Sequence, residues 1–445
     1  MTKYKQTLDW LFTRIPMFQR TGAAAYKKDL HNIRRLCAAF GNPQEQFPHI
    51  HIAGTNGKGS TAHLTAAVMQ AHGLKTGLYT SPHYRDFRER IKIDGKFISR
   101  KTVIDFTDRH IALFEEMQPS FFEITVAMAF HYFAEQKVDI AVIETGLGGR
   151  LDSTNIITPL LSVITNIGYD HQMFLGDTLP LIAAEKAGII KKNVPVIIGE
   201  THPDTEPVFR RKAAEMNAPI YFADQFIRAE ELPSVPDPEA EEDYGKNLHR
   251  TVRTTFSVKI GEDMQDDYDV NLIGSYQAKN LQTVLQMLFV LPEVWPAFTP
   301  EREKIQYALQ NLKSLTNFIG RWHLLGTQPM IIADSAHNEQ GIAVALRQIN
   351  AVRFNNLHIV LGMVNDKEID KILQMLPRSA TYYYAKADIP RGLPAAELAQ
   401  KGQSHELRGK TYSSVRNALA AARRRAEEED FIYVGGSTFT VAEVV

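Results

Sequence analysis

The chain has 445 residues, of which 44% are hydrophobic and 23% are charged. A chain of this length is too long to fold around one ordinary hydrophobic core, so we expect a globular protein with two domains. The 50 Lys and Arg residues nearly balance the 51 Asp and Glu residues, and this balance argues against a dedicated nucleic-acid-binding protein.

The first 47 residues are predicted to be largely helical, with an arm at 15–26 that is rich in aromatic and small residues. They lack the apolar core of a signal peptide, and no apolar run in the chain approaches the ~18 residues that span a bilayer. The single cysteine, Cys37, cannot form an internal disulfide and is interpreted as a small buried residue. We therefore expect a cytoplasmic protein that binds neither membranes nor nucleic acid.

From residue 48 onward, short apolar runs alternate with longer amphipathic stretches. The runs cover 49–53, 75–80, 138–143, 160–166 and 194–198. Such alternation predicts a mostly parallel sheet with helices on both faces. Ligands of such a sheet collect at the carboxyl ends of its strands.

The second half of the chain predicts further elements. Residues 229–247 are acidic and Pro-rich and are interpreted as a surface insertion, whereas 251–258 and 268–273 are predicted to be paired strands. Residues 301–313 are predicted to be helical and to lead into a junction near 314–322. A second alternation at 330–333, 358–363, 380–385 and 431–434 predicts a smaller Rossmann-like domain. Arg423–Arg425 and Glu427–Glu429 place opposite charges four apart, which predicts one solvated helical face.

The segment 51–61 joins an apolar strand to a glycine-rich loop and to a helix expected from Ser60 to His72. Its glycines, Gly54, Gly57 and Gly59, allow a tight turn that points successive N–H groups inward. Lys58 adds a positive charge and the helix N-terminus adds its dipole, so the loop predicts a polyphosphate site. The spacing departs from the standard P-loop, since Ile52 stands where the general pattern has Gly. A glycine-rich turn without a ligand is the alternative.

Further motifs follow this loop in a fixed order. The first is Thr80-Ser81-Pro82-His83 with Glu89-Arg90-Ile91, and the second is Glu144-Thr145-Gly146-Leu147-Gly148-Gly149-Arg150-Leu151-Asp152-Ser153-Thr154-Asn155. The third is Asp170-His171 with Gly176 and Glu185-Lys186-Ala187-Gly188-Ile189-Ile190. The last are Gly320-Arg321 and Asp334-Ser335-Ala336-His337-Asn338. Together they resemble the Mur ligase family, whose members form amide bonds with ATP. The Lys58-Gly59-Ser60 variant resembles the folate branch, the folylpolyglutamate synthases and dihydrofolate synthases.

The resemblance runs from about residue 48 to 340 and implies an α/β fold. It implies a P-loop-containing, mostly parallel sheet domain of the Mur ligase central type at 1–317, which also holds the folate site. A smaller Rossmann-like α/β domain is expected at 318–445.

The implied activity is an ATP-dependent ligase that adds L-glutamate to a folate-type carboxylate through an acyl phosphate, releasing ADP and phosphate. The acceptor is dihydropteroate, a reduced folylglutamate, or both. A carboxylate is a poor electrophile in water, and phosphorylation by ATP gives it a good leaving group. The protein must then hold the reactants together, neutralise phosphate charge and exclude water.

The resemblance implies nucleotide contacts at nine positions: Thr55, Asn56, Gly57, Lys58, Gly59, Ser60, Asn280, Arg321 and Asp334. Asp334 ends an apolar strand and could accept hydrogen bonds from ribose hydroxyls. Arg321 could reach phosphates when the domains close, and an interdomain salt bridge is its alternative. The family's Asp-Gly-Ala-His-Asn-Pro motif reads Asp334-Ser335-Ala336-His337-Asn338-Glu339 here, and His337 is expected at the substrate.

Glu144 ends the strand at 138–143 and is a candidate Mg²⁺ ligand, with a cap of the following turn as the alternative. The resemblance implies that His171 and Ser81 complete the metal set, and that Ser81 also meets substrate. Zinc is not expected, because this ligand set has no thiolate cluster and no close His pair.

Lys186 resembles a lysine that this family commonly carbamylates with CO₂, which turns a cation into an anion that helps to order a second metal. This chemistry requires its pKa to fall from the ordinary ~10.4 through burial or nearby cations. The alternative is an ammonium that contacts phosphate directly. Together with Lys58, Glu144 and His171, Lys186 completes the predicted catalytic set.

For the pterin-bearing substrate, the resemblance implies contacts at Ser120, Phe122, Glu123, Asp152 and Ser153. The Phe122 ring could stack on a flat heterocycle, and Asp152 could accept hydrogen bonds from an aminopterin edge. The alternative is that Phe121 and Phe122 are core residues that open the helix at 123–135.

Three other functions stay open. A peptidoglycan-type Mur ligase usually has a longer N-terminal substrate domain than the 47 residues that precede this loop. A P-loop switch or kinase would need neither the carbamate lysine nor a glutamate-binding domain. A non-catalytic scaffold would be expected to lose Glu144, His171 or Lys186. The expected partners are small molecules only, and the resemblance implies a monomer.

Overall fold

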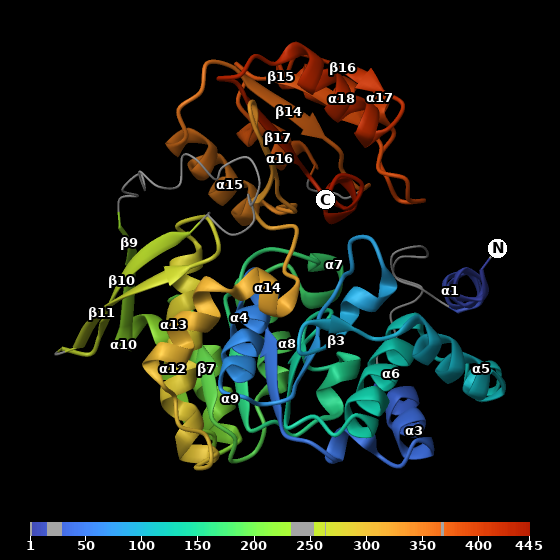
Figure 1. The fold of residues 1–445 in the computed structure, drawn as a ribbon, viewed down its shortest axis with the longest axis vertical. Coiled ribbons are helices and arrows are strands. Elements are labelled where there is room, and N and C mark those ends of the chain that lie inside the picture. Colours follow the sequence, from blue (N-terminus) through green and yellow to red (C-terminus); the bar gives the residue numbers. More distant parts are fainter. Residues whose placement is uncertain (1, 16–28, 233–252, 263, 366–368) are drawn as a thin grey trace. The chain divides into compact units, whose positions relative to one another are not determined.

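The computed structural model describes residues 2–15, 29–232, 253–262, 264–365 and 369–445 (Figure 1). These residues form two compact units. The first holds the described residues up to 83, those from 87 to 232, and 253–318, and the second holds 84–86 and the described residues from 319 onward. No helix in these described ranges is long and apolar enough to cross a bilayer.

The first unit is built on an eight-stranded sheet with the strand order β4-β3-β2-β5-β1-β6-β7-β8. Strands β2, β5, β1, β6, β7 and β8 pair in parallel, and β3 and β4 add an antiparallel edge. The prediction of a mostly parallel sheet is confirmed. The strands are β1 His49–Ala53, β2 Thr76–Tyr79, β3 Ile91–Ile93, β4 Lys96–Phe97, β5 Ile140–Glu144, β6 Leu161–Ile164, β7 Val196–Ile198 and β8 Ile220–Phe222.

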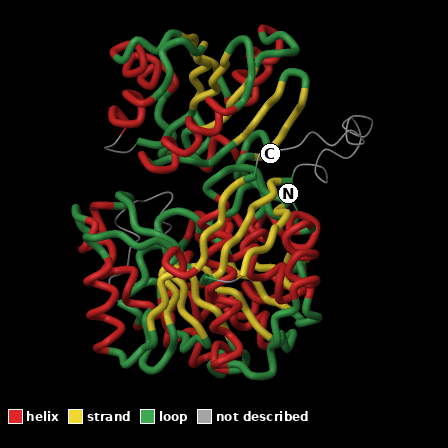
Figure 2. Tube along the Cα trace, turned by 90° about the vertical axis from the view of Figure 1, so that its left-hand side faces the viewer, coloured by secondary structure: helices red, strands yellow, loops and turns green. Residues whose placement is uncertain are grey.

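Helices cover both faces of this sheet (Figure 2). Successive strand residues point to opposite faces, so Ile140 and Val142 of β5 enter one hydrophobic core while Ala141 and Ile143 enter another. The longer helices are α1 Lys3–Arg14, α3 His31–Ala39, α4 Lys58–Ala71, α5 Arg100–Met117, α6 Phe121–Glu135, α8 Leu179–Lys186, α9 Glu206–Glu215, α12 Gln277–Val294 and α13 Arg302–Gln310. The short ones are η2 Pro43–Glu45, η3 Phe87–Arg90, α7 Gln172–Leu175, η4 Ser153–Ile156, η5 Ala187–Ile189, α10 Ala223–Phe226 and α14 Leu312–Thr316.

A small antiparallel sheet, β11-β10-β9, completes the first unit. Its strands are β9 Ile227–Glu231, β10 Thr254–Ile260 and β11 Met264–Val270, so the predicted pairing of two strands here is confirmed with shifted ends. Residues 229–231 were expected in the surface insertion but belong to β9, because they pair with β10. Residues 233–247 of that segment and most of the predicted arm at 15–26 lie outside the described residues.

Two helix predictions need correction. The helix expected at 301–313 is divided at Asn311 into α13 and α14. In the second unit, α18 ends at Arg425, so Glu427–Glu429 do not share its surface. The backbone is extended at Ala426, and the Asp430 carboxylate accepts the Glu427 N–H at 2.9 Å. This local hydrogen bond gives the backbone an alternative to another helical turn.

The second unit has a six-stranded sheet with the order β12-β13-β17-β14-β15-β16. All its pairings are parallel except that of β12 with β13, and the predicted Rossmann-like alternation is confirmed. The strands are β12 His323–Thr327, β13 Met330–Ala333, β14 Leu357–Leu361, β15 Thr381–Ala385, β16 Gly409–Tyr412 and β17 Phe431–Gly435. The helices are α15 Glu339–Ala351, α16 Ile369–Met375, α17 Ala395–Ser404, α18 Val415–Arg425 and α19 Thr438–Ala442.

Acid is expected to destabilise the first unit through His49, which is buried at the start of β1. Burial lowers the pKa of His49 from 6.5 to about 4, so the unfolded state binds more protons below pH 6.5. The free energy of unfolding should therefore fall between pH 7 and pH 5 by about 2 kcal/mol from this residue alone. Urea unfolding at the two pH values measures the loss. His49→Gln should reduce it and exposed His31→Gln should not, whereas an undiminished loss in His49→Gln would contradict the assignment.

Candidate active site

The glycine-rich loop lies between β1, which ends at Ala53, and α4, which begins at Lys58. Two positions in it require glycine. A Cβ at Gly54 would lie 1.9 Å from Thr165 Oγ1, and a Cβ at Gly57, where φ is +84°, would lie 2.4 Å from Asn280 Oδ1. At Gly59 a Cβ would come no closer than 3.9 Å to the Glu144 carboxylate, so this position leaves room beside an acid.

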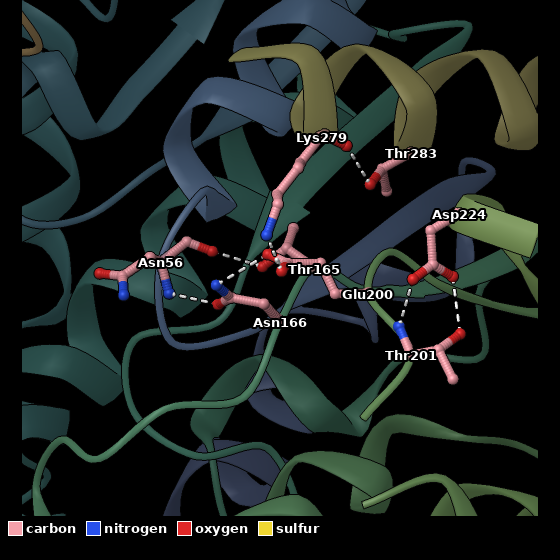
Figure 3. Close-up of polar contacts among 8 residues, drawn as sticks. All are labelled: Asn56, Thr165, Asn166, Glu200, Thr201, Asp224, Lys279 and Thr283. Atoms are coloured by element: carbon pink, nitrogen blue, oxygen red, sulfur yellow. Dashed lines mark hydrogen bonds and ion pairs between the residues drawn. The ribbon is translucent and has the colours of Figure 1, made fainter. Parts of the chain in front are cut away.

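Hydrogen bonds from the end of β6 hold this loop in place (Figure 3). The N–H of Thr55 donates to the carbonyl of Asn166 at 2.9 Å, and the N–H of Asn56 donates to Asn166 Oδ1 at 2.8 Å. Thr165 Oγ1 donates to the Asn56 carbonyl at 2.6 Å, and the Gly168 N–H donates to Thr55 Oγ1 at 3.0 Å. The turn is therefore fixed by the protein itself.

Two lysines converge on the carbonyl of Gly54. Lys58 Nζ donates to it at 3.0 Å and to the Thr55 carbonyl at 3.1 Å, and Lys186 Nζ donates to it at 2.8 Å. Lys186 ends α8 and is buried. Burial and, to a smaller extent, the charge of Lys58 lower the pKa of Lys186 to about 7, against opposing effects of Asp170 and Asp152. The structure thus unites two predicted catalytic residues, and the pKa of Lys186 is shifted in the direction that carbamylation requires.

Glu144 is the last residue of β5 and is buried beside the first turn of α4. Its Oε2 accepts the N–H of Ser81 at 3.1 Å, so these two predicted metal ligands lie together. His171 precedes α7 with φ at +52°, and its Nε2 lies 3.7 Å from Asp170 Oδ1. Its role as a metal ligand stays a prediction.

Asn280, on α12, also lies at the loop. Its Oδ1 accepts from Thr61 Oγ1 at 3.5 Å and faces Gly57, while its Nδ2 donates to Gln277 Oε1 at 2.8 Å. Ser60 is buried in the first turn of α4. The predicted nucleotide contacts of the first unit therefore gather at the carboxyl edge of its sheet.

Asp152 anchors the glycine-rich turn that follows β5. Its Oδ2 accepts the N–H groups of Gly146 and Leu147, both at 2.8 Å, and its Oδ1 accepts the Thr154 hydroxyl at 2.6 Å and its N–H at 3.0 Å. The Thr154 hydroxyl lies 2.9 Å from Nε2 of buried His51. Burial raises the pKa of Asp152, although these hydrogen bonds oppose the effect. Asp152 therefore has a structural role in the turn, and its contact with pterin stays a prediction.

Ser120 and Glu123 form a capping box at the start of α6. The Ser120 N–H donates to Glu123 Oε2 at 2.6 Å, and the Glu123 N–H donates to Ser120 Oγ at 3.2 Å. Both side chains are thus committed to the helix terminus, and Ser153 is buried in η4 after Asp152. Their substrate contacts stay predictions.

The two neighbouring phenylalanines of α6 differ in their surroundings. Phe121 is buried in the core, where its ring packs against Phe87 at a centroid distance of 5.9 Å. Phe122 is only partly buried. Its ring lies directly against Gly146, because a Cβ placed on Gly146 would be only 2.4 Å from Phe122 Cζ. Phe122 is therefore the better placed of the two to meet a ligand at the turn.

In the second unit, Asp334 and Arg321 lie within one hydrogen-bonded group. Asp334 Oδ2 accepts the Trp322 N–H at 2.7 Å and Oδ1 accepts the Ala336 N–H at 2.8 Å. Arg321 Nη1 donates to the hydroxyl of Ser335, the residue that replaces the family's glycine. Burial raises the pKa of Asp334, and the Arg321 charge opposes this. His337 follows, with Nδ1 2.9 Å from the Ser335 carbonyl.

Family models of known proteins match both units of the chain. A family model described as the Mur ligase middle domain matches residues 52–288, and one described as the Mur ligase, glutamate ligase domain matches 320–438. The chain belongs to the Mur ligase family. This confirms the resemblance of the motifs and establishes that the protein is a ligase.

Curated relatives place this Mur ligase in the folate branch. The folylpolyglutamate synthase of Lacticaseibacillus casei is 32% identical over 97% of this chain and 96% of its own length. The dihydrofolate synthase/folylpolyglutamate synthase of Bacillus subtilis is 31% identical over 100% of this chain and 98% of its own length. The chain spans 50% of the length of another relative, the probable bifunctional folylpolyglutamate synthase/dihydropteroate synthase of Haloferax volcanii, at 31% identity.

Solved structures agree with this placement of the Mur ligase. A complex of FPGS with AMPPCP and folate has a TM-score of 0.81 at 28% identity, covering 100% of this chain and 98% of its own. Escherichia coli FolC in complex with DHPP and ADP has a TM-score of 0.80 at 27% identity, covering 98% of this chain and 96% of its own. The predicted fold class is thereby confirmed.

Sequence reasoning missed several residues that shape the site of this Mur ligase. Asn166 follows β6 and Glu200 follows β7, so polar residues just past apolar strands were the available signal for both. Lys279 precedes the predicted Asn280. His51 and Thr154 lie within quoted motifs but were given no role, because their relation to Asp152 depends on the folded turn.

Proposed function

We propose that this ligase uses Mg²⁺ and ATP to join L-glutamate to a folate-type carboxylate, with dihydropteroate, a reduced folylpolyglutamate, or both as acceptor. The observation that carries the proposal is the convergence of Lys58 and Lys186 on the Gly54 carbonyl of a phosphate loop. The B. subtilis relative is named for both activities, and the FPGS complex with AMPPCP and folate supports the same substrate classes. We further propose a cytoplasmic monomer that binds small molecules, without nucleic acid or membrane partners.

The reaction would proceed in two displacements. A carboxylate oxygen of the acceptor attacks the γ-phosphorus of ATP, forming an acyl phosphate and releasing ADP. The amine of glutamate then attacks the acyl carbon, the C–O bond to phosphate breaks, and the amine loses a proton. Lys58 and the loop N–H groups would neutralise charge on the phosphoryl oxygens, which is where most catalysis of such transfers originates.

The donor set near the loop fits a hard cation. Glu144 supplies carboxylate oxygen beside the first turn of α4, the backbone N–H of Ser81 contacts this carboxylate, and Ser81 could add its hydroxyl oxygen, so the proposed set holds no thiolate. We assign Glu144, Ser81 and His171 as the residues that would hold Mg²⁺. When bound, this ion would supply charge neutralisation at the phosphate oxygens.

Lys186 is proposed to be carbamylated. The reaction joins the neutral Nζ to the carbon of CO₂ and releases a proton. A lysine whose pKa is about 7 has a substantial neutral fraction near pH 7, which ordinary lysines do not have. The resulting anion beside Lys58 would favour the positive charge of that phosphate-loop lysine.

Phe122 is expected to contact the acceptor heterocycle. Phe122→Ala should raise KM for the acceptor about tenfold, because ring stacking contributes roughly 1–3 kcal/mol, and should leave KM for ATP unchanged. Steady-state kinetics with each substrate varied in turn measures the difference. Phe226→Ala removes a ring that packs against Phe289 and serves as the control. A parallel rise in both KM values would argue against a stacking role.

The function itself is tested by ADP release with Mg²⁺-ATP and L-glutamate, comparing dihydropteroate with tetrahydrofolate as acceptor. Turnover with both acceptors is the result expected of a bifunctional synthase. Turnover with tetrahydrofolate alone would restrict the enzyme to extending glutamate tails. If neither acceptor gave glutamate-dependent ADP release, the folate assignment would be wrong.

A further inference from the structure

The carboxylate of Glu200 joins three separate elements beside the phosphate loop (Figure 3). Glu200 lies just past β7, and its Oε1 accepts from Asn166 Nδ2 at 3.1 Å. Its Oε2 pairs with the ammonium of Lys279 in the first turn of α12. The end of β6, the end of β7 and the start of α12 therefore meet at one acid.

Glu200 determines how the amide of Asn166 is oriented. Asn166 Oδ1 accepts the Asn56 N–H at 2.8 Å, while its Nδ2 donates to Glu200. A carboxylate can only accept, so it requires the NH₂ side of the amide to face β7. A flipped amide would place this NH₂ group against the Asn56 N–H, and the loop would lose its support.

The same acid also holds the start of α12. Lys279 neighbours Asn280, whose Oδ1 faces Gly57 of the phosphate loop. Packing here is close, since a Cβ on Gly199 would lie 2.4 Å from the Thr165 carbonyl oxygen and 2.6 Å from Thr283 Oγ1. Thr283 in turn donates to the Lys279 carbonyl at 2.8 Å.

We propose that Glu200 is a positioning residue for the nucleotide, which fixes the phosphate loop through Asn166 and the start of α12 through Lys279. The inference rests on the proposed use of ATP. The side chains of Glu200 and Lys279 are 27% and 58% exposed. Exposed ion pairs contribute only about 0–1 kcal/mol to folding, so the main effect of Glu200 is on nucleotide binding rather than on unfolding.

The test is calorimetric titration of the whole protein with ADP, together with KM values and urea unfolding. Glu200→Ala should weaken ADP binding and raise KM for ATP about tenfold, the size of losing a charge-assisted hydrogen bond. KM for the acceptor should not change. Glu200→Gln can still accept from Asn166 but cannot pair with the ammonium, so its effect should be smaller. Combining Glu200→Ala with Asn166→Ala should weaken binding by less than the product of the two separate effects.

Glu206→Ala is the matched control, because Glu206 pairs with Arg210 on α9 and its side chain has the same 27% exposure. It should bind ADP like the wild type. Unchanged ADP binding in Glu200→Ala, or an equal loss in Glu206→Ala, would overturn the inference. If Glu200→Ala does not fold, Glu200→Gln and Lys279→Met must both weaken ADP binding selectively, and failure of either to do so refutes it. A wild-type protein that does not bind ADP would refute the proposed function instead.

Discussion

Lys186→Ala is expected to lower kcat several hundredfold. Removing one group that stabilises charge in a transition state typically lowers kcat by about this factor. Lys186 is buried with its Nζ on the Gly54 carbonyl, beside Lys58. If its working form is a carbamate, formate or acetate added to the variant should restore part of the turnover. Initial rates with increasing carboxylate concentration measure this recovery.

The pH dependence supplies a second test of the same residue. Carbamylation needs a neutral amine, and the pKa of Lys186 is about 7. Wild-type activity should therefore fall as the pH decreases below 7 and should rise on addition of bicarbonate. Recovery of the alanine variant by amines but not by carboxylates would show that Lys186 acts as an ammonium.

Lys58→Ala is expected to reduce kcat/KM for ATP about a thousandfold, because the loop loses the ammonium that we propose neutralises phosphate charge, while its backbone stays in place. The turn itself is held by Asn166 and Thr165, so the variant should fold normally. Steady-state kinetics and ADP titration measure the loss.

Lys212→Ala is the control for Lys58, since Lys212 pairs with Glu215 on the surface of α9. This control should keep wild-type kinetics. Added carboxylates should not restore Lys58→Ala, which separates the roles of the two lysines. Near-normal kcat/KM for ATP in Lys58→Ala would remove the phosphate loop from the proposed mechanism.

Five of the six parallel strands in the main sheet of the first unit could be predicted because they are short apolar runs, whereas β8 and the edge strands β3 and β4 were not predicted. Each of the five runs between 49 and 198 overlaps a strand. The phosphate loop was equally clear, since Gly54 and Gly57 occur where the backbone has no space for a Cβ. These features depend on residues that are neighbours in the sequence.

Features that depend on competing local hydrogen bonds could not be predicted in this way. The charge pattern favoured one helix through Glu427–Glu429, but the Asp430 carboxylate captures the Glu427 N–H and α18 ends at Arg425. Acidic composition at 229–231 suggested an insertion, although β9 pairs there with β10. In both segments a specific hydrogen-bonding partner outweighs the average conformational preference of the residues.

The candidate site shows the same division. The motif residues Lys58, Lys186 and Glu144 gather as expected around the loop. The link from Asn166 through Glu200 to Lys279 joins segments that are far apart in the chain, so no local pattern reveals it. Likewise, only the folded turn shows that both oxygens of Asp152 are already occupied.

Residues Tyr84–Asp86 belong to the second unit, and this has a practical consequence for expressing that unit alone. The Tyr84 hydroxyl lies 3.0 Å from Ser335 Oγ, and its ring occupies the space that a Cβ on Gly320 would need. A truncated product that starts at residue 319 would lack this ring, leaving Gly320 and Ser335 exposed to water. The C-terminal fragment is therefore a poor candidate for separate expression, even though its own sheet is continuous in sequence.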